Sequence, residues 1–214
     1  MAERTSGEVV GIDISPVQLA HASKRTKGGR HSNLRFIEHD IMRLPELEEQ
    51  SFDAAVLMDA ACYLPDKHAA LLGIASRLRT GARFLLIDWC RSNRTTALQE
   101  EMILEPFYRY WCIPQMETVS SYRQAFKRAG FRLIDLEDLT PRVAPNWERG
   151  YWLAIRALSN GISAKQFLGA LTNVAKHGPR AVQLAKEQFY AALFAKAGCD
   201  AGFLRYVYFL AEKL

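Results

Sequence analysis

The sequence has no apolar run as long as the roughly 18 residues that suggest a membrane-spanning helix. Its start, Met1-Ala2-Glu3-Arg4, contains no apolar segment typical of a secretory signal peptide. Cysteine is scarce and scattered, without the spacing of a metal site: the four residues are Cys62, Cys90, Cys112 and Cys199. We therefore expect a cytoplasmic protein with reduced thiols, no metal and no contact with a membrane.

An excess of acidic residues is also absent, because the formal net charge is +5 and the pI is about 9.1. The basic residues concentrate between His21 and Arg30. This cluster would suit nucleic acid, but no aromatic residue interrupts it, and cations at the end of a helix complement the helix dipole. We favour the helix end and expect no nucleic-acid partner. The 214 residues, 49% of them hydrophobic, are enough for one core, so we expect a single domain over residues 1–214.

The clearest positive feature is the run Val9–Asp13, a β-branched stretch that ends in an acid. It precedes Ser15 and Pro16, which are typical of a helix start, so it predicts a buried parallel strand that leads into a helix. In nucleotide-binding α/β sheets, an acid at such a strand end accepts hydrogen bonds from ribose hydroxyls. A glycine-rich phosphate or cofactor loop would be expected earlier in the chain, but only eight residues precede Val9.

The remaining pattern alternates strands and helices, which favours a parallel sheet with right-handed crossovers. Residues 52–59 are nearly all apolar, as expected for a strand buried on both faces. Two later segments, about 93–116 and 146–200, are rich in aromatic residues and are expected to form a helical lid before the last strand. The other expected helices are 16–27, 66–79 and 119–129, and the other expected strands are 34–38, 83–89, 131–136 and 203–211.

Several segments, in this order, resemble class I S-adenosylmethionine-dependent methyltransferases of the small-molecule branch. They are Val9–Ser15, Phe36–Asp40, Phe52–Val56, Leu78–Asp88, Ala129–Phe131 and Tyr206–Lys213. The resemblance implies an α/β, Rossmann-like, mostly parallel sheet with flanking helices. It also implies S-adenosyl-L-methionine as cofactor.

The sequence departs from the family at its beginning, because nothing matches the family's first strand and glycine-rich loop. Relative to the family the chain is N-terminally truncated, and two strands are expected to expose unpaired edges. A partner chain or a homodimer could cover those edges. We expect this chain to bind S-adenosylmethionine weakly or not at all.

The resemblance also assigns cofactor contacts. Asp13 would bind the ribose hydroxyls, Ile14 would pack on adenine, and Asp40 would accept from the adenine amino group. Ile41 would contribute its backbone N–H and an apolar wall to the cofactor site. The alternative for these residues is an ordinary helix cap, turn or core position. The complete set of candidate cofactor residues is Asp13, Ile14, Gln18, Asp40, Ile41 and Met58.

Catalytic candidates follow the central strand and the next helix start. Asp59 could accept a proton, Tyr63 could present a hydroxyl to the substrate, and His68 could serve as a general base. The alternatives are a helix cap, a core aromatic and a surface histidine. Tyr63, Trp111 and Trp147 are the candidate substrate contacts, because aromatic-lined sites suit hydrophobic small molecules.

These observations favour an enzyme that methylates a hydrophobic, natural-product-like molecule. Two other functions stay open. The protein could have lost cofactor binding and catalyse a cofactor-free cyclisation or isomerisation, or it could be a non-catalytic partner subunit.

Overall fold

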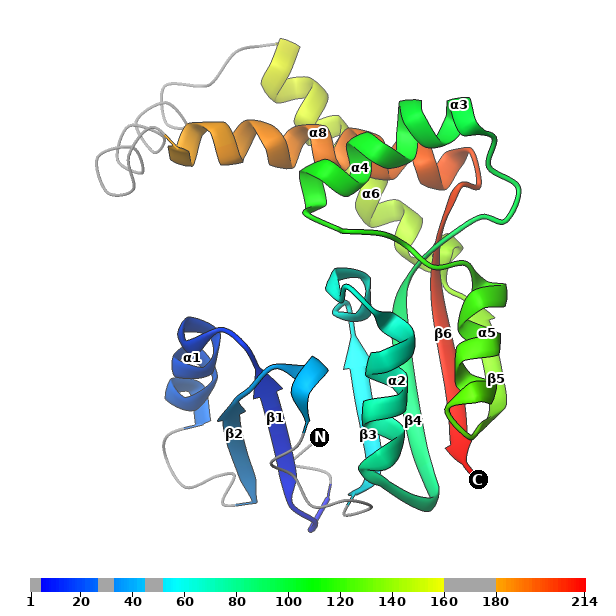
Figure 1. The fold of residues 1–214 in the computed structure, drawn as a ribbon. Coiled ribbons are helices and arrows are strands. Elements are labelled where there is room, and N and C mark those ends of the chain that lie inside the picture. Colours follow the sequence, from blue (N-terminus) through cyan, green and yellow to red (C-terminus); the bar gives the residue numbers. More distant parts are fainter. Residues whose placement is uncertain (1–4, 27–32, 45–51, 160–179) are drawn as a thin grey trace.

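The computed structural model describes residues 5–26, 33–44, 52–159 and 180–214. It has an α/β part with two sheets, and a layer of helices that lies across one end of the larger sheet (Figure 1). None of the helices in the described part of the chain combines the length and hydrophobicity of a membrane span.

The smaller sheet pairs β1 (Val9–Asp13) with β2 (Leu34–Glu38) in parallel, and α1 (Pro16–Thr26) connects the two strands. The chain turns into α1 through a local cap. The Asp13 carboxylate accepts from the Ser15 backbone N–H at 2.8 Å, and the Ser15 hydroxyl accepts from the Gln18 N–H at 3.3 Å. Both predicted strands and the predicted helix start are confirmed.

The larger sheet has the order β3-β4-β6-β5. Strands β3 and β4 are parallel, whereas β6 runs antiparallel to both β4 and β5. The sheet is therefore mixed, as the Rossmann-like class allows. Its strands are β3 (Phe52–Met58), β4 (Leu78–Arg91), β5 (Phe131–Asp138) and β6 (Leu204–Lys213).

The predicted helix 66–79 is too long. The helix α2 (Lys67–Ser76) begins after its cap Asp66, and Leu78 already belongs to β4. The reason is a long-range strand pairing, because Phe52 of β3 lies opposite Leu78 and its N–H donates to the Arg77 carbonyl at 3.0 Å. Sheet pairing therefore overrides the helical pattern.

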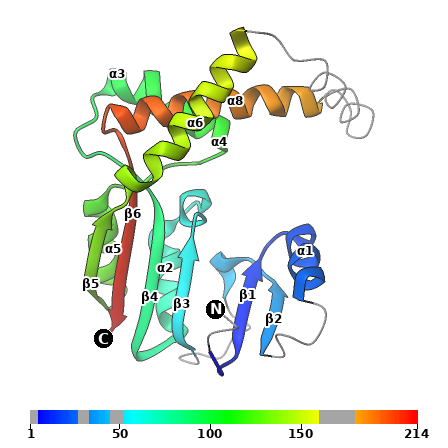
Figure 2. The same ribbon diagram turned by 180° about the vertical axis from the view of Figure 1, so that it is seen from behind.

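Within the described residues, β1 pairs only with β2 and β3 pairs only with β4. The two sheets stand next to each other without a ladder of hydrogen bonds between them, which is visible from both sides (Figure 1 and Figure 2). The expected pair of open strand edges is thus present.

The main core lies between the larger sheet and two helices, α2 and α5 (Val119–Arg128). Both helices cover the same face of that sheet (Figure 1). Phe84 and Leu86 of β4 meet Phe126 of α5 and Phe209 of β6, and all four side chains are buried. Burying side chains of this size stabilises the fold by about 1.5–3 kcal/mol each.

The prediction that the strand at 52–59 is buried on both faces is wrong. Val56 and Met58 are exposed on β3, because α2 and α5, the helices of the described residues that pack on this sheet, cover the same face of it.

The helical layer forms a second apolar cluster. It contains Leu104, Phe107, Met116 and Ala195, and β6 contributes Leu204. The layer precedes β6 as predicted, although its third helix begins at Thr140. Residues 160–179 of the predicted lid segment 146–200 lie outside the described residues. The elements of the layer are α3 (Ala97–Gln99), the π-helical turn η4 (Glu100–Leu104), α4 (Glu105–Trp111), α6 (Thr140–Ser159) and α8 (Arg180–Asp200).

Candidate active site

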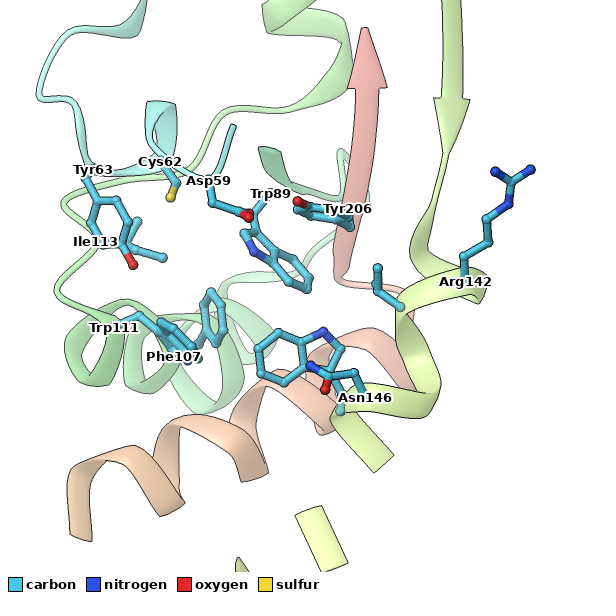
Figure 3. A pocket seen from close by; sticks show the side chains of 12 residues that line it. Asp59, Cys62, Tyr63, Trp89, Phe107, Trp111, Ile113, Arg142, Asn146 and Tyr206 are labelled. Carbon is cyan, nitrogen blue, oxygen red and sulfur yellow. The ribbon is translucent and has the colours of Figure 1, made fainter. Parts of the chain in front are cut away.

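A cavity of about 500 Å³ lies where β3 and β4 end, between the sheet and the helical layer (Figure 3). The carboxyl ends of parallel strands are where α/β proteins place their ligands. Half of its twelve lining residues are aromatic, and the six rings belong to Tyr63, Trp89, Phe107, Trp111, Trp147 and Tyr206.

The rings hold one another in place across four elements. Trp89 of β4 lies opposite Tyr206 of β6 in the sheet register, with ring centroids 5.0 Å apart. Trp147 of α6 meets Trp89 edge-on at 5.4 Å, and Trp111 of α4 meets Trp147 at 5.7 Å. Tilted and edge-on pairs at these distances are favourable, so the sheet and the helical layer form one continuous aromatic wall.

Asp59 lies at the top of this cavity, directly after β3. Its backbone N–H donates to the Ile87 carbonyl at 3.0 Å, and its φ of 50° is in the left-handed region. Such a conformation is uncommon for a residue other than glycine and concentrates at functional sites. The Tyr206 hydroxyl donates a hydrogen bond to the Asp59 carboxylate, and both side chains project into the cavity (Figure 3).

Asp88 supports the same site from behind. Its side chain is fully buried on β4 and accepts from the backbone N–H groups of Cys62 and Trp89 at 2.8 and 2.7 Å. Burial raises the pKa of the Asp88 carboxyl, and the two N–H groups partly oppose this shift. Asp88 thereby fixes the 3-10 turn η3 (Ala61–Tyr63), which brings Cys62 and Tyr63 to the cavity.

The phenols of the cavity stay protonated at neutral pH. Burial is the largest cause that raises the pKa of Tyr63, and the neighbouring Cys62 and Asp88 add to it. Burial also raises the pKa of Tyr206, followed by its hydrogen bond to Asp59. Both hydroxyls are therefore hydrogen-bond donors rather than bases.

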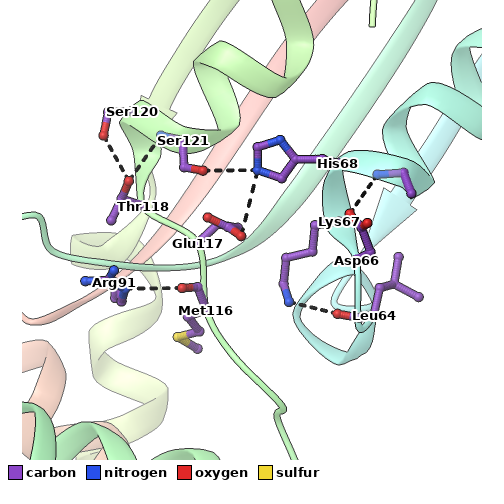
Figure 4. Close-up of polar contacts among 11 residues, drawn as sticks. Leu64, Asp66, Lys67, His68, Arg91, Met116, Glu117, Thr118, Ser120 and Ser121 are labelled. Atoms are coloured by element: carbon purple, nitrogen blue, oxygen red, sulfur yellow. Dashed lines mark hydrogen bonds and ion pairs between the residues drawn. The ribbon is translucent and has the colours of Figure 1, made fainter. Parts of the chain in front are cut away.

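His68 is not among the residues that line the cavity. It lies on α2, where its Nε2 is 3.2 Å from the Ser121 hydroxyl and 3.8 Å from a Glu117 carboxylate oxygen (Figure 4). Both contacts use the same ring nitrogen, so the three residues do not form a relay in which an acid orients a base. The arrangement joins α2 to the start of α5.

The candidate cofactor residues gather at the carboxyl ends of β1 and β2. Only one oxygen of the Asp13 carboxylate is engaged in the described part of the chain, by the Ser15 N–H. Beside it, Ile14 is 69% exposed. Asp40 accepts from the Met42 N–H at 2.8 Å and caps the turn η2 (Ile41–Arg43). A free carboxylate oxygen beside an exposed aliphatic side chain fits the ribose and the adenine of an adenosine group.

The other two cofactor candidates are exposed. Gln18 is an exposed residue in the first turns of α1, and Met58 is 53% exposed at the end of β3. Met58 directly precedes Asp59, which lines the aromatic cavity.

Four of the predicted substrate or catalytic residues line the cavity: Asp59, Tyr63, Trp111 and Trp147. Two lining residues, Trp89 and Tyr206, were not predicted as site residues from the sequence. Trp89 could have been found, because it follows the strand pattern at 83–88 in the same way that Asp59 follows its strand. Within the described residues, no three His, Cys, Asp or Glu side chains come together as metal ligands.

Comparison with known proteins shows which family model matches this chain and which proteins are similar to it. A family model described as a methyltransferase domain matches residues 1–141. The sterol 24-C-methyltransferase of Saccharomyces cerevisiae is 26% identical over 218 residues, which cover 94% of this chain and 56% of that protein. The chain spans between 37% and 56% of the length of the first curated relatives that it matches.

Two solved structures have the same fold at low sequence identity. A putative sarcosine dimethylglycine methyltransferase from Galdieria sulphuraria superposes with a TM-score of 0.74 at 17% identity, over 96% of this chain and 69% of that one. A geranyl diphosphate methyltransferase in complex with SAM superposes with a TM-score of 0.70 at 17% identity, over 99% of this chain and 71% of that one.

Proposed function

The chain belongs to the methyltransferase family, and on this premise we propose that it methylates a hydrophobic small molecule bound in the aromatic cavity, with S-adenosylmethionine as methyl donor. The observation that carries the proposal is the position of the cavity. It opens at the carboxyl ends of β3 and β4, at the same edge where β1 and β2 present Asp13 and Asp40. A donor site and an acceptor site on one edge are what a group transfer requires.

Four residues support a place for the adenosine part of the cofactor. The free oxygen of Asp13 would accept from the ribose hydroxyls, and the exposed Ile14 would cover one face of the adenine. Asp40 and Ile41 would meet the edge of that ring, while Gln18 and Met58 would form the rim. When bound, the cofactor supplies a methyl group that is already activated on a sulfonium.

The residues of the cavity position the acceptor and exclude water from it. Asp59 would take the proton that the acceptor loses, since it is the carboxylate in the lining. Tyr206 orients that carboxylate through its hydrogen bond, and Tyr63 offers a second hydroxyl donor. Positioning supplies most of the rate enhancement in such a reaction.

A hydrophobic acceptor is supported by the lining of the cavity and by the names of similar proteins, which include a sterol methyltransferase and a geranyl diphosphate methyltransferase. Those substrates belong to those proteins. For this chain the acceptor class is a proposal that rests on the six rings around the cavity.

The deciding experiment combines calorimetric titration with S-adenosylmethionine and a methyl-transfer assay with radiolabelled donor and a panel of sterol, terpenoid and amine acceptors. Transfer that depends on the donor supports the proposal. Turnover of an acceptor without added donor would instead favour the cofactor-free reaction. The titration also tests the expected weak binding, which a dissociation constant in the micromolar range would refute.

A further inference from the structure

The charged groups that face the aromatic cavity are acidic rather than basic. Asp59 lines the cavity, and the buried Asp88 lies behind its wall. Arg142 also belongs to the lining, but its guanidinium pairs with Glu137 at 2.7 Å and extends away from the rings (Figure 3). Among the described residues that line the cavity, the carboxylate of Asp59 is therefore not paired with a cation of the lining.

The other cations near the site are engaged elsewhere. Lys67 is buried and donates to the Leu64 carbonyl at 2.9 Å, and Arg205 lies 3.9 Å from an Asp138 carboxylate oxygen. Arg91 donates to the Met116 carbonyl (Figure 4). None of these three residues lines the cavity.

The aromatic rings add to the same electrostatic preference. The face of an aromatic ring carries partial negative charge and attracts a cation within about 6 Å of its centroid. Three of the six rings in this lining are tryptophans, which are the strongest partners of this kind. A cation that leaves water for this cavity would meet ring faces and one carboxylate, both of which stabilise it.

From this arrangement we infer that the substrate of the cavity is an apolar molecule with a positively charged amine, and that the ammonium group lies against Asp59. The inference rests on the proposed function, because it names the acceptor class of that same site. Tyr206 and the Ile87 carbonyl already fix the side chain and the backbone of Asp59, so its carboxylate is pre-organised for such a group.

The behaviour of the neighbouring acids agrees with a negative potential in the cavity. Burial is the largest cause that raises the pKa of Cys62 and of Tyr63, and the charges of Asp88 and Asp59 add to it for both, whereas Lys67 lowers the pKa of Cys62. A potential that disfavours new negative charge favours a bound cation by the same interaction.

The test uses three probes that share a phenyl group and differ in charge: phenethylamine, 2-phenylethanol and phenylacetate. Three of the four tryptophans line the cavity, so binding is followed by tryptophan fluorescence. The exposed Trp152 lies outside this cavity, and the variant Trp152→Phe removes its background signal. We expect the amine to bind at least about tenfold more tightly than the alcohol, and phenylacetate to bind most weakly.

Asp59→Asn provides the specific control, since asparagine tolerates the left-handed conformation and keeps the shape of the side chain. In this variant the preference for the amine should fall to about twofold or less. Asp53→Asn, which changes an exposed acid on the same strand, should leave the preference intact. Equal binding of amine and alcohol by the native chain, or tighter binding of phenylacetate, would overturn the inference, even if Asp59→Asn failed to fold.

These titrations contain no methyl donor, so the two proposals can fail independently. A preference for the amine in a protein without methyl-transfer activity would support the inference and count against the proposed function. Methylation of neutral acceptors without any preference for the amine would support the proposed function and count against the inference.

Discussion

Among single residues, Asp59 concentrates the most information about the site. It has a left-handed backbone, a hydrogen bond from Tyr206 and a place in the aromatic cavity. Its position could be predicted, because an acid that follows a parallel strand lies at the carboxyl edge of the sheet, although β3 is an edge strand of the larger sheet and not the central strand that the sequence predicted. Tyr206 could not be predicted in the same way. It reaches the cavity only because β6 is antiparallel, which brings the beginning of β6 beside the end of β4.

The proposed cofactor role of Asp13 gives a first prediction. Asp13→Asn should weaken the binding of S-adenosylmethionine and of its demethylated product by about 10-fold to 100-fold, because hydrogen bonds to a charged acceptor contribute about 1.5–3 kcal/mol. The asparagine oxygen can still accept from the Ser15 N–H, so α1 should keep its start. Calorimetric titration measures the change, with Asp53→Asn as the matched surface variant. Unchanged affinity would show that the cofactor does not contact Asp13.

A second prediction concerns pH and the buried Asp88. Because burial raises its pKa, the folded protein holds this proton more tightly than the unfolded chain does. The free energy of unfolding therefore decreases as pH rises from the ordinary carboxyl pKa of 3.8 to the raised value, by up to about 1.4 kcal/mol per pH unit. Above the raised pKa of Asp88, the free energy of unfolding does not decrease further on account of this group.

Asp88→Asn cannot ionise and should lack this decrease, although one of the two N–H groups on Cys62 and Trp89 loses its acceptor. The variant should be less stable than the native protein at acid pH, and the difference should shrink as pH rises. Urea unfolding followed by circular dichroism at several pH values measures both curves. Parallel curves would contradict the assignment.

At the scale of helices and strands, close packing decides whether a glycine of the helical layer can be replaced by alanine. A Cβ added at Gly198 of α8 would lie 2.6 Å and 2.7 Å from two side-chain carbons of the buried Leu204. At Gly150 of α6 the same Cβ would meet the Ala192 Cβ at an ordinary 3.6 Å. The helical layer is therefore tight where α8 leads into β6 and looser between α6 and α8.

This difference gives a matched pair of variants. Gly198→Ala should reduce the free energy of unfolding by about 1–3 kcal/mol, because Leu204 must move within a filled cluster. Gly150→Ala should increase it by up to about 1 kcal/mol, since alanine is the better helix former and finds space. Urea unfolding of both variants measures these two changes in the free energy of unfolding. A loss of equal size in the two would mean that packing at Leu204 is not the cause.

The elements themselves were predictable where local signals agreed with the final packing. The strand at Val9–Asp13 and the helix start at Pro16 could be predicted from the sequence. The end of α2 could not, because the pairing of Phe52 with Leu78 depends on residues far away along the chain. The exposure of Val56 and Met58 was also unpredictable from composition, since an apolar strand does not reveal how many of its faces are covered.

At the scale of the whole molecule, the part formed by β1, α1 and β2 is less buried than the four-stranded sheet. Not one described residue before Leu44 is fully buried, whereas β4 and β6 supply several buried side chains to the main core. Local stability follows the density of buried apolar contacts. The part formed by β1, α1 and β2 should therefore open more easily than the four-stranded sheet.

Native-state hydrogen exchange tests this expectation. The backbone amides of β1 and β2 should exchange with a free energy of opening several kcal/mol below that of β4 and β6, which should approach the global value. Equal protection in both sheets would mean that the molecule unfolds as one cooperative unit. Addition of S-adenosylmethionine should slow exchange in β1 if the proposed ribose contact of Asp13 is correct.

The position of β6 in the middle of its sheet has a consequence for the order of folding. The strand pairs on one side with β4, where Arg83 lies opposite Glu212, and on the other side with β5. Ladders between partners so distant in sequence close large loops and form slowly. Strands β4 and β5 do not pair with each other and are connected in the sheet only through β6. Because Tyr206 belongs to β6, its pair with Asp59 can form only after β6 has joined β4, so we expect the cavity to form late in folding.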